Sequence, residues 1–89
     1  KPDHAESNKY LGAIFLETGQ TQRAVKLLVR AIETNPDCHE AYCNLGLAHK
    51  RLEEYEDAIK CLEKALELCP DQIAAAKALD ELKGSKAAR

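Results

Sequence analysis

The sequence contains little glycine or proline and has no long apolar run. Only four of its 89 residues are glycine and three are proline, which suits an ordered domain better than a disordered segment. No stretch approaches the roughly 20 apolar residues that cross a bilayer. The residues Lys1-Pro2-Asp3-His4 also lack the apolar core of a secretory signal. We therefore expect a soluble, folded domain.

The sequence also lacks an excess of either charge. Thirteen Lys and Arg residues face fifteen Asp and Glu residues, for a formal net charge of -2. A phosphate-binding protein is expected to show a strongly basic surface. Arg23, Lys26 and Arg30 do share one helical face, but such stripes are usually solvated. The composition argues against nucleic acid or a membrane surface as the partner.

Nothing in the sequence resembles a disulfide framework. Four cysteines are present, yet a helical domain needs no covalent staple, and no signal of secretion accompanies them. We expect reduced thiols and a reducing compartment, the cytoplasm or the nucleus. The cysteines are Cys38, Cys43, Cys61 and Cys69.

No metal or catalytic constellation is readable either. His39 and Cys43 would share a helical face near Cys38, but no fourth ligand or paired CxxC motif accompanies them. The histidines and cysteines form no pattern of nucleophile, base and orienting group. His49 stands 34 residues after Phe15, at an aromatic position of the internal repeat that the next paragraph describes. We expect no metal, no cofactor and no enzymatic activity.

What the sequence does contain is an internal repeat of 34 residues. Small and apolar residues recur at this spacing along most of the chain. The recurring sets are Gly12 and Gly46, Ala24 and Ala58, Ala31 and Ala65, Leu11 and Leu45, Leu28 and Leu62, and Pro2, Pro36 and Pro70.

Within each repeat, apolar residues three and four apart predict two helices. The expected helices are 5–18 and 21–34, then 39–52 and 55–68, separated by short breaks that contain Gly or Pro-Asp. The small residues should let the antiparallel pairs pack closely. The expected core is Leu11, Phe15, Val25, Leu28 and Ile32, then Tyr42, Leu45, Ile59, Leu62 and Leu66.

This pattern resembles the tetratricopeptide repeat (TPR). Residues 39–72, from His-Glu-Ala-Tyr-Cys-Asn-Leu-Gly to Leu-Cys-Pro-Asp-Gln, follow the family consensus closely, and residues 5–38 fit it as well. The resemblance implies an all-α fold in which antiparallel helix-turn-helix repeats form a right-handed α-solenoid.

The ends of the chain suggest how the array is organised. Residues 73–83 predict a capping helix, because Asp80 stands where a further repeat would have its glycine. We expect residues 84–89 to be a flexible tail and residues 1–4 to be the end of a preceding repeat or a linker. The chain would then be the C-terminal end of a longer array.

The resemblance also implies a function, the binding of a peptide or amphipathic helix of a partner protein on the concave face. A scaffold or adaptor role follows. The alternatives are a structural spacer, a self-association segment, or the substrate-recognition array of a larger enzyme. The family's groove positions fall on Lys9, Ala13, Leu16, Glu40, Cys43, Asn44, Leu47, Lys50 and Arg51, with Glu6 and Glu17 beside them.

One subclass of the family binds the C-terminal carboxylate of heat-shock chaperones with a clamp of basic and amide side chains. Lys9 and Asn44 occupy two clamp positions, but Ala13, Ala74 and Ala78 replace the other donors. A carboxylate would be poorly paired there, so the sequence argues against this ligand.

Overall fold

The structure, a computed structural model that describes residues 4–87, consists of five α-helices with no strand among those residues. The first four helices begin and end within one residue of their predicted limits, so the all-α prediction is confirmed. The helices are α1 (His4–Glu17), α2 (Thr21–Thr34), α3 (His39–Arg51), α4 (Tyr55–Leu68) and α5 (Ile73–Ala87).

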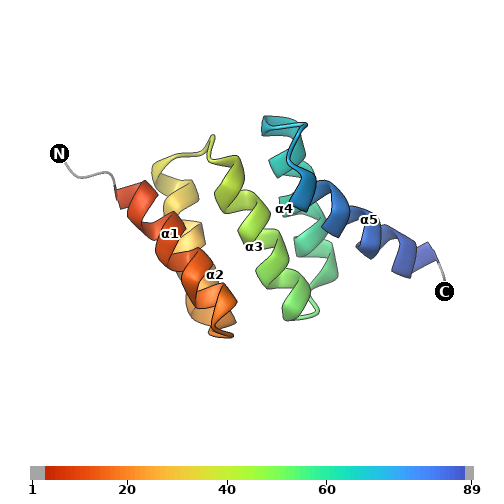
Figure 1. The fold of residues 1–89 in the computed structure, drawn as a ribbon, viewed down its shortest axis with the longest axis horizontal. Helices are drawn as coiled ribbons and strands as arrows, with labels where there is room; N and C mark the ends of the chain where they lie inside the picture. The colour runs from red at the N-terminus through yellow and green to blue at the C-terminus, as the bar shows by residue number, and fades with distance from the viewer. Residues whose placement is uncertain (1–3, 88–89) are drawn as a thin grey trace.

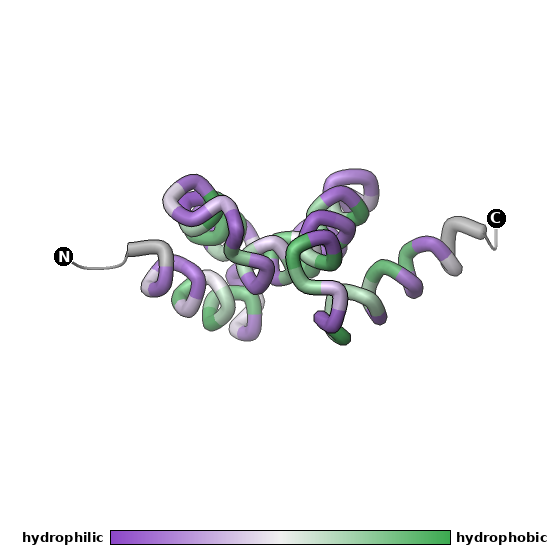
Figure 2. The backbone as a smooth tube through the Cα atoms, turned by 90° about the horizontal axis from the view of Figure 1, so that it is seen from above, coloured by the Kyte–Doolittle hydropathy of each residue, from purple (hydrophilic) through white to green (hydrophobic). Residues whose placement is uncertain are grey.

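Consecutive helices form hairpins that stack along the long axis of the molecule (Figure 1). Helix α2 packs against both α1 and α3, and α4 packs against both α3 and α5. Seen from above, α2 and α4 lie on one side, whereas α1 and α5 lie on the other with α3 between them (Figure 2). This arrangement is that of an α-solenoid built from two hairpins and a closing helix.

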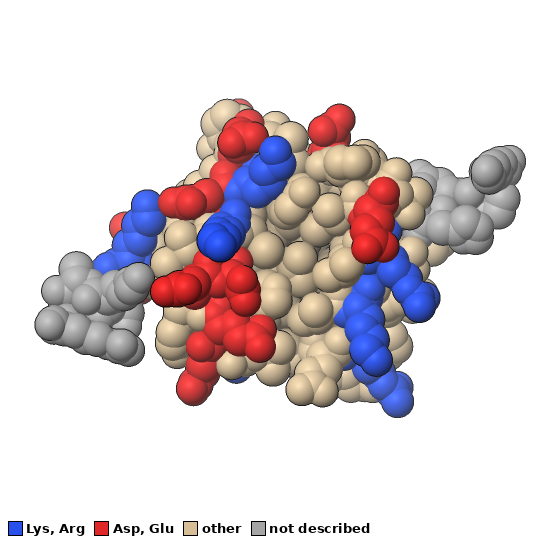
Figure 3. All heavy atoms as spheres, turned by 180° about the vertical axis from the view of Figure 1, so that it is seen from behind, with Lys and Arg blue, Asp and Glu red and all other residues tan. Residues whose placement is uncertain are grey.

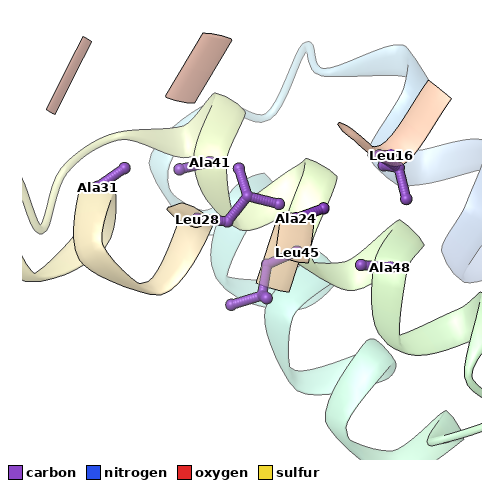
Figure 4. Close-up of a cluster of buried hydrophobic side chains, with 7 residues drawn as sticks. All are labelled: Leu16, Ala24, Leu28, Ala31, Ala41, Leu45 and Ala48. Carbon is purple, nitrogen blue, oxygen red and sulfur yellow. The ribbon is translucent and has the colours of Figure 1, made fainter. Parts of the chain in front are cut away.

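The core consists of two clusters that meet at α3. In the first, Leu28 of α2 lies among alanines of α2 and α3 (Figure 4). Because alanine side chains are short, the helix backbones approach closely around this leucine. The first cluster contains Leu16, Ala24, Leu28, Ala31, Ala41, Leu45 and Ala48, and the second contains Cys43, Ala58, Leu62, Ala65, Ala75, Ala78 and Leu82.

Both hairpins turn through the same backbone geometry. Gly19 has φ 85° in the first turn, and Glu53, one repeat later, has φ 62° in the second. The amide of Gln20 donates to the Phe15 carbonyl at 2.8 Å, and the amide of Glu54 donates to the His49 carbonyl at 2.9 Å. Since a side chain at positive φ is strained, the second turn keeps its shape at a cost that the first avoids.

Two predictions differ from the structure. Leu11 was expected in the core but is 45% exposed, because no described helix covers that face of α1. The closing helix was expected to end at residue 83 but continues to Ala87, since a helix tolerates one glycine at about 1 kcal/mol. The expected repeat end at residues 1–4 and the expected tail at 84–89 lie partly outside the described residues.

The length of the helices bears on membrane insertion. Over residues 4–87 the longest helix has 15 residues, and none of the described helices is long and apolar enough to span a bilayer.

The two repeated glycines mark the closest contacts inside the hairpins. A Cβ atom built on Gly46 would lie 2.7 Å from Cγ of the fully buried Leu62 and 3.2 Å from the Ala58 carbonyl oxygen. A Cβ atom built on Gly12 would likewise lie 2.7 Å from Cγ of Leu28. Neither leucine can move freely, so any side chain at these glycines must push the helices apart.

We predict that Gly46→Ala destabilises the protein by about 1–3 kcal/mol through overpacking, in spite of alanine's better helix propensity. The matched control is Gly84→Ala in α5, where nothing lies within 4 Å of the added methyl group and a gain of up to about 1 kcal/mol is expected. Urea denaturation of both variants measures the difference. Equal effects would show that packing at Gly46 is not limiting.

Candidate protein-binding surface

A hollow of about 240 Å³ opens between α1, α3 and the turn that precedes α5. Four of the predicted groove residues line it, and Tyr10 and Gln72 complete it. Because residues of both α1 and α3 line it, a partner lying across it would contact both hairpins at once. The lining residues are Lys9, Tyr10, Ala13, Glu40, Asn44 and Gln72.

A buried lysine connects the two hairpins at this hollow. Lys9 is only 7% exposed, and its ammonium donates to Glu40 of α3 at 2.7 Å and to Glu6 at 3.4 Å. The same nitrogen lies 4.7 Å from the ring centroid of Tyr10, within the range of a cation–π contact. The charge of Lys9 is therefore already compensated inside the protein.

The ion pair shifts both of its members toward the charged form. The hydrogen bond to Glu40 raises the pKa of Lys9, against the opposing effect of burial. The hydrogen bond from Lys9 lowers the pKa of Glu40 below its ordinary value of 4.5. The contribution of Glu40 to stability is thus complete above pH 4.5 and is lost as the pH falls through the folded-state pKa.

Two further predicted groove cations also contact this chain. The ammonium of Lys50 donates to Glu81 of α5 at 2.6 Å, and the guanidinium of Arg51 donates to the main-chain carbonyl of Leu16. These contacts join α3 to α5 and α1 to α3. Lys50 and Arg51 therefore support the stack, and less of their hydrogen-bonding capacity remains for a ligand.

Three of the predicted groove residues lie in or against the core instead. Leu16 and Cys43 are buried, and Leu47 is partly buried against both core clusters. The family's groove positions, from which these residues were predicted, do not show how deeply the neighbouring helices cover each side chain. Tyr10 and Gln72, which line the hollow, were missed. Gln72 follows the Pro-Asp break, and only the fold brings it beside α1 and α3.

The opposite side of the molecule carries its charged side chains near the two margins, around a band without charge (Figure 3). Arg23, Lys26 and Arg30 are exposed on α2, as a solvated stripe would be. The four cysteines are free thiols. Among the residues described, Cys38, His39 and Cys43 do not gather their donor atoms as a metal site requires.

Comparison with known proteins agrees with the repeat found in the sequence. The family described as "Tetratricopeptide repeat" matches residues 39–72, and the family described as "TPR repeat" matches residues 12–53. The chain belongs to the tetratricopeptide-repeat family. The two matches overlap in α3 and together cover residues 12–72, which include most of both hairpins.

Solved structures share the TPR fold. MamA is 30% identical with a TM-score of 0.88 over 93% of this chain and 48% of its own. A TPR domain protein from Salinibacter ruber is 23% identical with a TM-score of 0.79, over 90% of this chain and 96% of its own. The first TPR of Spaghetti (RPAP3), bound to the HSP90 peptide SRMEEVD, is 19% identical with a TM-score of 0.62, over 98% of this chain and 96% of its own. The last two likenesses concern the fold alone.

Among curated proteins, the mouse (Mus musculus) Protein O-mannosyl-transferase TMTC1 is 31% identical over 70 residues. This match covers 79% of the present chain and 7% of the mouse protein. The chain thus spans a small part of that relative and about half of MamA. The likeness to the mouse protein concerns the 70 matched residues alone. TPR repeats in general act as protein-binding scaffolds.

We predict that Glu40→Gln destabilises this TPR pair by about 1–2 kcal/mol at pH 7, because a charged hydrogen bond to a buried ammonium is lost. The expected loss is small for a charged hydrogen bond because the Glu40 side chain is half exposed, and solvent screens the interaction. The variant should also lose less stability than the native chain between pH 7 and pH 3. Urea denaturation at both pH values measures this. An equal acid-induced loss in both proteins would contradict the assignment.

Proposed function

We propose that this chain is a protein-interaction module that holds a peptide or amphipathic helix of a partner protein across the hollow between α1, α3 and the turn before α5. The observation that carries the proposal is the mixed lining of the hollow. Tyr10 is 57% exposed and offers an aromatic surface. Asn44 offers both a donor and an acceptor for a ligand's backbone. An apolar anchor beside a few polar groups is typical of peptide-binding grooves.

The partner segment that fits this hollow is apolar or amphipathic rather than a strongly acidic tail. Lys9 is compensated by Glu40 and Glu6, so it has little charge to offer a carboxylate. Ala13 lines the hollow and Ala78 is buried, and neither can donate a hydrogen bond from its side chain. These features distinguish the surface from a carboxylate clamp.

A binding role rather than a catalytic one is also supported by the thiols. Burial raises the pKa of Cys43 and raises that of Cys61 to about 11. A protonated thiol is a poor nucleophile. Neither cysteine is therefore activated at neutral pH. A catalytic domain elsewhere in a longer chain, with this array choosing its substrates, stays compatible with the proposal.

The groove is tested by affinity capture from lysate followed by mass spectrometry. We predict that a partner bound by the native chain is lost, with capture lowered at least tenfold, in the double variant Tyr10→Ala and Asn44→Ala. The matched control is Arg30→Ala on α2, which should capture the partner normally. Circular dichroism establishes that every variant is folded. Unchanged capture by the double variant would exclude the hollow as the binding site.

A second candidate, self-association or stacking, is favoured by the uncovered face of α1. Leu11 and Ile14 are 45% and 53% exposed. One repeat later, the corresponding Leu45 and Ala48 are buried in the cluster that α2 completes. We propose that a helix like α2 covers α1, supplied by a preceding hairpin of a longer array. In the chain alone, a second copy would take its place.

We therefore predict that the isolated chain self-associates with rising concentration in sedimentation velocity, and that the double variant Leu11→Glu and Ile14→Glu stays monomeric. The control is Ile73→Glu at the other end of the stack, where an exposed isoleucine lies away from α1. If Ile73→Glu self-associates as the native chain does, the result supports the α1 face as the site of contact between copies. A native chain that is monomeric throughout would reject association through this face.

A further inference from the structure

Three possible metal ligands surround the turn between α3 and α4. His49 is near the end of α3, and Glu54 and Asp57 are at the start of α4. The Nδ1 atom of His49 lies 2.7 Å from a carboxylate oxygen of Glu54, and one ligand atom from each of the three residues lies within 4.8 Å of the other two. None of the three lines the groove hollow.

The charge of this group is not balanced by a lysine or arginine. Among the residues described, the ion pairs of the molecule join Glu54 only to His49 and include none to Asp57. The side chain of Glu54, at the N-cap position of α4, makes no capping hydrogen bond. Its oxygens are thus left to His49 and to any added cation.

The first repeat provides an internal comparison. One repeat earlier, Phe15, Gln20 and Arg23 occupy the corresponding positions. The backbone of that turn is equivalent, yet there Gln20 accepts a hydrogen bond from Arg23 at 3.1 Å. The TPR turn therefore brings these three positions together in both hairpins. Only the second hairpin places an imidazole and two carboxylates on them.

We propose that His49, Glu54 and Asp57 form a binding site for a divalent transition-metal ion of the Zn²⁺ and Co²⁺ class. One imidazole with two carboxylates is a ligand set that such borderline ions accept. Ligand atoms around a tetrahedral ion lie about 3.4 Å apart, so the His49–Glu54 pair at 2.7 Å must separate slightly, and any separation nearer the 4.8 Å limit must shorten. Glu54 and Asp57 are exposed, and their side chains can rotate to do so, with water at the remaining position.

The test uses Co²⁺ as the probe, because its unpaired electrons perturb the NMR signals of nearby amides. The full chain is titrated with Co²⁺ in a non-chelating reducing agent while ¹H–¹⁵N spectra are recorded. We expect signals from the second turn, residues 48–58, to broaden or shift first. The turn at the other end of α3, residues 34–39, lies about 15 Å away along the helix and should stay sharp, so it serves as the reference within the same molecule.

Two variants and one control complete the test. His49→Phe, which installs the residue of the first repeat, and Asp57→Asn should each weaken Co²⁺ binding at least tenfold. Cys61→Ser, one helical turn from Asp57, should bind as the native chain does. The same spectra report whether each variant is folded. Perturbation spread equally over both turns, centred on the cysteines, or changed less than twofold by the two variants would overturn the proposal.

Discussion

The contact on which the stack depends is the one between a glycine in the first helix of each hairpin and a buried leucine in the second. A Cβ at either Gly12 or Gly46 would come within 2.7 Å of that leucine, so the helices are as close as the backbones permit. Alanines at 24, 31, 58 and 65 keep the same spacing along α2 and α4. This close packing lets a short chain bury two leucine-centred clusters with few large side chains.

The same spacing determines the chemistry of the surface between α1 and α3. Because α2 holds these helices side by side, Lys9 reaches Glu40 across the repeat boundary at 2.7 Å, and Arg51 reaches the carbonyl of Leu16. Polar side chains that a consensus assigns to ligand binding are here used within the protein. Tyr10, which is 57% exposed, and Asn44 line the hollow beside these internal contacts.

The fold could be predicted because a 34-residue period constrains every helix at once. How deeply each side chain is buried could not be predicted in the same way. Leu28, Leu45 and Leu62 were correctly placed in the core. Leu11 sits at the position equivalent to Leu45, but no helix among residues 4–87 covers it, which the sequence pattern cannot reveal. Lys9 is buried because Glu40 can compensate it, and that compensation depends on a contact between residues 31 positions apart. Burial of this kind depends on neighbouring helices rather than on helical phase.

Differences between the two repeats carry information that the shared consensus does not. The shared residues specify one framework, so the residue type at a position that differs while its backbone stays the same is not fixed by that framework. Glu53 shows this most clearly, because it keeps the positive φ of Gly19 in spite of its side chain. The neighbouring changes to His49, Glu54 and Asp57 cluster at the same turn, where the framework gains no packing from two exposed carboxylates. The strain lies at Glu53, and the carboxylates of Glu54 and Asp57 suit the N-terminus of α4. The combination of these two carboxylates with an imidazole is a property of the second turn that the shared framework does not require, because the first repeat forms the same turn without it.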